Sequence, residues 1–157
     1  MKRAFLISIL CILLIAFSGD AHSDFYRDKV VVLLYHEIAD TRKNSATIPP
    51  LLFRKHMAIL EQNFNVISLD DVVAFQNGTK SIPPNAVAIT FDDGYRSNYD
   101  IAYPILKQHD WPATVFLTLN DVGRINPTLE WLTWEQITEM SAHKFSFGSH
   151  SCTHGTI

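Results

Sequence analysis

The sequence has little cysteine and no cluster of basic residues, and both deficits exclude classes of protein. Cys11 and Cys152 are the only cysteines among its 157 residues. Because Cys11 lies in an N-terminal apolar run, the rest of the chain has no pair for an internal disulfide and must be held by its apolar core or by a metal ion. The formal net charge of −3, without any run of Lys or Arg, argues against a nucleic-acid partner.

Residues 1–23 have the pattern of a secretory signal peptide. Lys2-Arg3 precedes an apolar run of 14 residues, 4–17, and small residues then suit cleavage before Asp24. A run of this length is short for a membrane span, although an uncleaved N-terminal anchor is the alternative. We therefore expect an exported chain, periplasmic or extracellular, that contacts a membrane only through its signal peptide and forms a domain over residues 24–157.

The remainder of the chain alternates between strand-like and helix-like segments. Runs rich in apolar and β-branched residues predict buried strands; they lie at 30–35, 65–67, 86–91, 113–117 and 145–148. Amphipathic or capped segments predict helices between them; these lie near 53–64, 69–76, 97–108 and 134–142. Such alternation is typical of parallel strands joined by helical crossovers, so we expect an α/β fold built on one parallel sheet.

Capping residues and a proline predict where the helices begin. Ser68 and Ser97 are each expected to cap a helix, and Thr133 with Gln136 forms a capping box. Pro104 is expected to kink the helix over 97–108 or to delay its start.

Two adjacent carboxylates follow the central strand. Asp92 and Asp93 come directly after the run 86–91, and Gly94 then breaks the strand. Two charges at the rim of a core are costly unless a cation or hydrogen-bond donors meet them. A turn without function is the alternative for such a motif. A phosphotransferase nucleophile is disfavoured, because Gly94 occupies the place where that chemistry usually has a second acid.

A pair of histidines near the end of the sequence supplies further metal ligands. His150 and His154 follow the last predicted strand, and the carboxyl ends of parallel strands meet at one face of the sheet. One carboxylate and two imidazoles suit Zn²⁺ with a position left open for water, and Fe²⁺, Co²⁺ and Ni²⁺ accept the same ligands. We assign Asp93 as the ligand and Asp92 as the general base, although the spacing alone does not distinguish them.

Three further expectations concern the neighbours of these residues. Asp92 and Asp93 are not expected to be equivalent ligands, because adjacent residues of an extended strand point in opposite directions. Cys152 is interpreted as a small buried filler between the two histidines rather than as a ligand. His36, at the end of the first strand, either approaches the site or is hydrogen-bonded under a loop.

These segments resemble those of a known family. Thr90-Phe91-Asp92-Asp93-Gly94-Tyr95 resembles the first motif of the polysaccharide deacetylases, carbohydrate esterase family four, and Ser149-His150-Ser151-Cys152-Thr153-His154 resembles the second. Leu33–Ile38 and Leu132–Gln136 are further similarities. The resemblance implies a distorted (β/α) barrel, incomplete in this chain. It also implies that Asp92 is the catalytic base and that Asp93, His150 and His154 hold a divalent metal, with Zn²⁺ as the expected ion.

The activity implied by the resemblance is metal-dependent hydrolysis of N-acetyl groups from an amino-sugar polysaccharide. The early Tyr35-His36-Glu37 segment points to the poly-N-acetylglucosamine deacetylase subgroup. The family's later motifs, including a Leu-x-His that supplies its general acid, are not found before residue 157. We therefore expect an N-terminal portion with weak metal binding and little turnover. A non-catalytic polysaccharide-binding relative and a periplasmic metal-binding protein are the alternatives.

Overall fold

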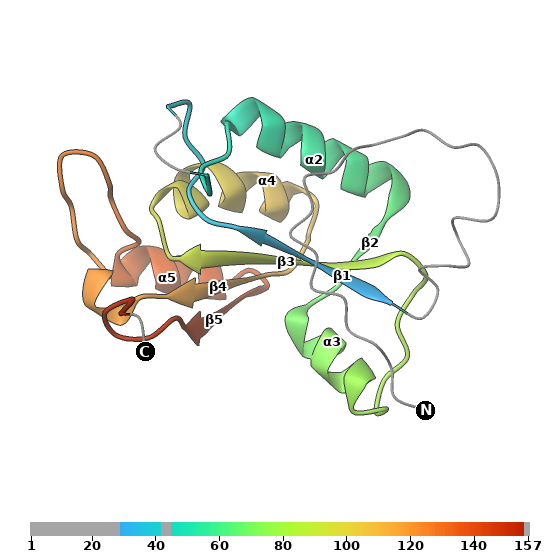
Figure 1. Cartoon of the computed structure of the whole chain (residues 1–157). Helices are drawn as coiled ribbons and strands as arrows, with labels where there is room; N and C mark the ends of the chain where they lie inside the picture. The colour runs from blue at the N-terminus through green and yellow to red at the C-terminus, as the bar shows by residue number, and fades with distance from the viewer. Residues whose placement is uncertain (1–28, 42–44, 156–157) are drawn as a thin grey trace.

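The strands form one parallel sheet whose spatial order differs from their order in the chain (Figure 1). The computed structural model describes residues 29–41 and 45–155, so the predicted signal peptide lies outside the described residues. The strands are β1 (Val30–Tyr35), β2 (Asn65–Val66), β3 (Ala86–Asp93), β4 (Ala113–Leu117) and β5 (Phe145–Ser149). All pairings among them are parallel, which confirms the predicted α/β class.

β3 is the central strand and is buried from Ala86 to Phe91. β1 pairs with it along one edge, from Val30 opposite Ala86 to Tyr35 opposite Phe91. β2 and β4 therefore share the other edge: β2 pairs near the start of β3 and β4 pairs near its end. β5 pairs with β4. Within the described residues the sheet is open between β1 and β5, which agrees with an incomplete barrel.

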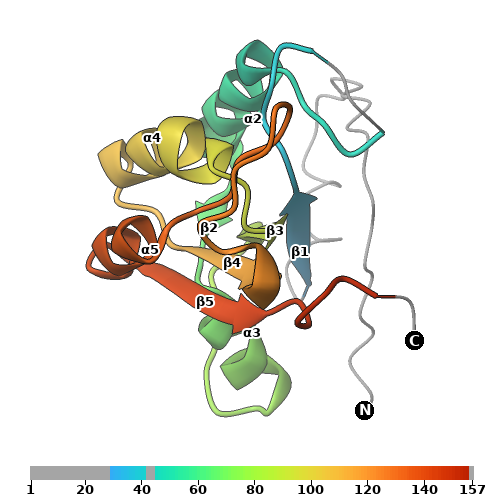
Figure 2. The same cartoon turned by 90° about the vertical axis from the view of Figure 1, so that its left-hand side faces the viewer.

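Helices cover both faces of the sheet (Figures 1 and 2). They are α2 (Pro50–Asn63), α3 (Leu69–Gln76), α4 (Tyr103–Gln108) and α5 (Trp134–Ser141). Alternate residues of β3 separate two cores. The larger core packs against α2, α4 and α5, and the smaller one packs against α3. Val87, Ile89 and Phe91 belong to the larger core and Ala86 and Ala88 to the smaller. None of the helices in the described part of the chain has both the length and the apolarity needed to cross a bilayer.

Two of the three predicted caps are confirmed. The Ser68 hydroxyl accepts a hydrogen bond from the Asp71 amide, and Thr133 and Gln136 form the reciprocal capping box of α5. The Ser97 prediction is wrong, because Ser97 has helical backbone angles and its hydroxyl accepts instead from the Ile38 amide at 3.0 Å. A π-helical turn, Asn98–Ala102, follows it.

Pro104 delays the start of the third predicted helix. α4 begins only at Tyr103, with Pro104 in its first turn, where a proline costs no intrahelical hydrogen bond.

An antiparallel hairpin over residues 123–132 connects β4 to α5. Its arms are joined by hydrogen bonds from the Gly123 amide to the Leu132 carbonyl and from the Trp131 amide to the Arg124 carbonyl, and by a bridge between Ile125 and Glu130. The hairpin lies beyond the carboxyl end of β4 (Figure 2). It therefore borders the rim of the sheet where the predicted site residues are found.

Gly94 is required at the end of β3 for two separable reasons. Its φ is +70°, and a Cβ added there would lie 2.6 Å from Leu117 Cδ2. Gly78 has a similar φ of +72°, but an added Cβ would meet nothing within 4 Å. A comparison of the two positions therefore isolates the steric contact.

We expect Gly94→Ala to lower the free energy of unfolding by about 1–3 kcal/mol more than Gly78→Ala, because overpacking adds to a backbone cost common to both variants. Urea unfolding of the two variants measures this difference. Equal losses would show that Leu117 moves aside without cost.

Candidate metal centre

The two aspartates at the end of β3 both face His150. Asp92 Oδ2 lies 3.9 Å and Asp93 Oδ1 lies 3.5 Å from His150 Nε2, and both carboxylates are largely buried. Asp93 has a φ of +69°, so the backbone leaves the extended conformation at this residue. The premise that the adjacent side chains point in opposite directions fails because it assumed an extended segment, but Asp93 alone of the two joins the histidines in the cluster of possible ligand atoms.

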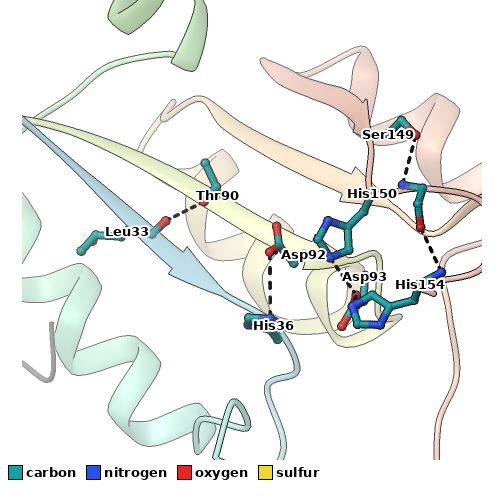
Figure 3. Close-up of polar contacts among 9 residues, drawn as sticks. Leu33, His36, Thr90, Asp92, Asp93, Ser149, His150 and His154 are labelled. Atoms are coloured by element: carbon teal, nitrogen blue, oxygen red, sulfur yellow. Dashed lines mark hydrogen bonds and ion pairs between the residues drawn. The ribbon is translucent and has the colours of Figure 1, made fainter. Parts of the chain in front are cut away.

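The tail after β5 is fastened along the end of β4. The His150 amide donates to the Leu117 carbonyl at 2.8 Å, and the Leu119 and Asn120 amides donate to the Ser151 and Cys152 carbonyls. The chain then turns back, with the His154 amide donating to the Ser151 hydroxyl at 3.0 Å. This turn brings the imidazole of His154 next to that of His150, with ring centres 5.0 Å apart (Figure 3).

The structure brings the three predicted metal ligands together. Asp93 Oδ1 lies 3.5 Å from His150 Nε2 and 3.4 Å from His154 Nε2, and one ligand atom from each residue falls within 4.8 Å of the others. Tetrahedral Zn²⁺ with ligands at about 2.0–2.1 Å requires ligand atoms about 3.3–3.4 Å apart. Asp93 Oδ1 is buried and has no hydrogen-bond partner among the described residues, so the donor set fits a divalent cation.

Asp92 lies between two imidazoles from different strands. His150 Nε2 is 3.9 Å from Asp92 Oδ2, and His36 Nε2 is 4.0 Å from the same oxygen (Figure 3). Burial raises the pKa of Asp92, because desolvation outweighs the opposing effect of the nearby imidazoles, and the charge of Asp93 adds to the increase. Asp92 is therefore a stronger base than an exposed aspartate.

His36 lies beside the site. Of the two alternatives for this residue, the structure favours the position near the Asp pair over one under a loop. The end of β1 is held by the segment that follows the Asp pair. Asn98 Nδ2 donates to the His36 carbonyl at 2.9 Å, and Ser97 accepts from the Ile38 amide. Asn98 is fully buried. The position of the His36 imidazole beside Asp92 thus depends on contacts about 60 residues away in sequence.

Tyr95 is a site neighbour that the sequence analysis did not single out. Burial, followed by the nearby charge of Asp93, raises the pKa of Tyr95 to about 12. Its ring stacks on Trp131 of the hairpin, with centroids 5.7 Å apart. The available signal was its place in the Asp-Asp-Gly-Tyr motif, two residues after a predicted ligand.

Cys152 is exposed with a free thiol, so its interpretation as a buried filler is wrong. The tail runs along the rim of the sheet, where no described element covers it. Cys152 is also not among the clustered ligand atoms.

A cavity of about 450 Å³ lies beside the segment that follows the Asp pair; Tyr95 forms part of its wall, and the candidate metal ligands do not line it. Its polar lining includes Glu37, Asp100 and the ion pair of Arg96 with Glu130. Such a lining suits a ligand rich in hydroxyl or amine groups rather than an apolar one.

Comparison with known proteins gives consistent matches. The model of the polysaccharide deacetylase family matches residues 79–157. YxkH of Bacillus subtilis (strain 168) is 35% identical over 127 residues, which cover 80% of this chain and 43% of YxkH. The poly-beta-1,6-N-acetyl-D-glucosamine N-deacetylase of Escherichia coli (strain K12) is 38% identical over 78 residues, 49% of this chain and 11% of that protein.

Among solved structures, IcaB from Ammonifex degensii superposes with a TM-score of 0.71 at 30% identity, over 77% of this chain and 52% of IcaB. The chain thus spans about half the length of IcaB and less of the curated relatives. The family model covers half of the chain and includes both the Asp pair and the two histidines. On these matches, the chain belongs to the polysaccharide deacetylase family.

Proposed function

We propose that this chain carries the metal site and general base of a deacetylase that removes N-acetyl groups from an amino-sugar polysaccharide. The convergence of Asp93, His150 and His154 beside an unligated Asp92 carries the proposal. Family membership supports the reaction type. Relatives named as poly-beta-1,6-N-acetyl-D-glucosamine N-deacetylases support a polymer of N-acetylglucosamine as the substrate class.

Asp93, His150 and His154 would hold the cation, and Zn²⁺ is the ion we expect there. When bound at such a site, Zn²⁺ lowers the pKa of a water molecule and polarises an amide carbonyl. The proton transfers of the reaction would be carried out by side chains around the cation. Hydrolysis adds water across the amide bond, so that acetate and a free amine leave.

Asp92 would accept the proton of the attacking water. Its Oδ2 is within 4.0 Å of both His150 and His36, and its raised pKa favours proton uptake. The departing amine must also gain a proton. His36 lies 4.0 Å from Asp92 on the side away from the ligands, and the resemblance assigns this proton to a histidine of the family's later Leu-x-His motif rather than to His36.

Export of the chain, with residues 1–23 as signal peptide and 24–157 as domain, remains part of the proposal. It rests on the N-terminal sequence pattern alone. A non-catalytic polysaccharide-binding relative is the second candidate, and it is favoured only if the cation site proves dispensable for what the protein does.

The cation site predicts different effects for the two aspartates. Asp93→Asn removes a charged ligand and is expected to weaken Zn²⁺ binding by more than about 100-fold, beyond the loss typical of residues that only support a ligand. Asp92→Asn should leave Zn²⁺ affinity nearly unchanged, because Asp92 is not a ligand. Competition with a chromophoric chelator measures both affinities. The assignment of base and ligand is reversed if the two variants exchange these results.

Catalysis is tested by acetate release from N-acetylglucosamine oligomers. Release by the Zn²⁺-loaded chain should be slow, should stop when a chelator removes the metal, and should fall by about 10²–10⁴-fold in Asp92→Asn, the range that a general base contributes. Oligomer affinity, measured in parallel, should survive the same substitution. Oligomer binding without any acetate release, unchanged in Asp92→Asn, would instead favour the non-catalytic relative.

A further inference from the structure

The end of β1 extends beyond the part of the sheet that holds it. The last pair in the ladder between β1 and β3 joins Tyr35 to Phe91, so His36 lies one residue past the ladder, beside Asp92. β1 has no strand on its other edge within the described residues. The backbone of His36 therefore needs contacts from outside the sheet if its imidazole is to keep a fixed place.

Two side chains of the turn after the Asp pair supply those contacts. Asn98 Nδ2 donates to the His36 carbonyl at 2.9 Å, and Ser97 Oγ accepts from the Ile38 amide at 3.0 Å. The two bonds hold the residues on either side of Glu37, and they come from a segment about 60 residues away in sequence. Together they fix the backbone at both ends of the short stretch that begins with His36.

Asn98 begins a π-helical turn. The turn covers Asn98–Ala102 and is closed by a hydrogen bond from the Tyr103 amide to the Asn98 carbonyl, and the Asn98 side chain is fully buried. π-Helical turns are rare, and they occur often at functional sites. The rare conformation and the complete burial together indicate that the place of this side chain matters for more than the helix that follows.

The hydrogen bonding of Asn98 suits a positioning group better than a stabilising one. Its Nδ2 has a partner, but its Oδ1 is buried and accepts no hydrogen bond in the described part of the chain. A buried acceptor without a partner costs free energy, which offsets much of what a single hydrogen bond contributes, and an apolar side chain of similar size can be nearly neutral in the same place. The distinctive contribution of Asn98 is therefore the donor that it presents to His36.

The residue that Asn98 holds lies against the proposed base. His36 Nε2 is 4.0 Å and His150 Nε2 is 3.9 Å from Asp92 Oδ2, so two imidazoles flank this carboxylate (Figure 3). His150 is fixed by the bond from its own amide to the Leu117 carbonyl, whereas His36 depends on the turn. Loss of the Asn98 bond would free the His36 imidazole to move away from Asp92.

We propose that Asn98 is a positioning residue that keeps His36 beside the general base Asp92. Ser97 supports the same stretch through its bond to the Ile38 amide. The inference rests on the proposed function, in which Asp92 takes the proton of the attacking water. It gives a role in the reaction to a turn whose residues are not among the clustered ligand atoms.

Asn98→Leu tests this inference, because it removes the donor and the unpartnered oxygen while it keeps a side chain of similar size. We expect the NMR signals of the His36 imidazole to shift. We also expect kcat for acetate release to fall by about 10–100-fold with KM unchanged, the range for residues that act through a neighbour at a metal site. Zn²⁺ affinity should stay that of the parent chain.

Asn65→Leu is the matched control. Asn65 Nδ2 also donates to a backbone carbonyl, that of Pro84, at 2.8 Å, but Asn65 pairs with the start of β3, at the opposite end from the site. Loss of this bond should change neither the His36 signals nor kcat nor Zn²⁺ affinity.

Ser97 provides a second test that leaves the buried amide intact. Ser97→Ala removes the acceptor of the Ile38 amide and should also shift the His36 signals. Ser97→Thr keeps a hydroxyl, with room for its methyl group in the cavity that residue 97 lines, and should restore them. Unshifted His36 signals and a parental kcat in both Asn98→Leu and Ser97→Ala would overturn the positioning role alone. If the parent chain releases no acetate, the proposed function fails, and the role of Asn98 in the reaction fails with it.

Discussion

A buried carboxylate oxygen at the end of the central strand is the constraint on which the rest of the site depends. β1 pairs with β3 as far as Phe91, and β4 pairs with it as far as Asp93, so the end of β3 is held along its β4 edge. Oδ1 of Asp93 is buried and accepts no hydrogen bond in the described part of the chain, and an ionised group in that position is costly without compensation. The imidazole nitrogens of His150 and His154 lie 3.4–3.5 Å from this oxygen, and a divalent cation shared by all three groups would offset its charge. The tail after β5, held to the end of β4 by backbone hydrogen bonds, brings those two imidazoles to this oxygen.

The backbone turn at the end of β3 connects this electrostatic requirement to packing. Asp93 and Gly94 both have positive φ, which turns the two carboxylates toward one side, and the side chain of Leu117 fills the space where a Cβ of Gly94 would lie. Leu117 also accepts the His150 amide through its carbonyl. The end of β4 therefore fixes the Asp motif and the first histidine at once, so the sheet sets the positions of two of the three proposed ligands.

The strands and two of the helix caps were predicted correctly, because they follow from local or periodic preferences of the sequence. The strands could be recognised because residues such as Val87 and Ile89 are buried among other elements, and the caps at Ser68 and Thr133 depend only on residues three positions away. The predictions for Ser97 and Cys152 were wrong, and Tyr95 was not singled out, because the environments of these residues are tertiary. Ser97 bonds β1 rather than its own helix, Cys152 follows a tail that stays on the surface, and Tyr95 meets a hairpin whose residues lie about 30 positions away.

The central position of β3 also separates the two tasks of the proposed reaction. The cation ligands other than Asp93 come from β5 and its tail, beyond one edge of β3, whereas His36 comes from β1 at the opposite edge. Asp92 is the group that contacts both sides, at 3.9 Å from His150 and 4.0 Å from His36. In the proposed site, the cation ligands from the tail and His36 therefore lie beyond opposite edges of β3, with Asp92 between them. A change in the β1 edge, including the contacts of Asn98 and Ser97 that hold it, would alter proton transfer while leaving the cation ligands in place.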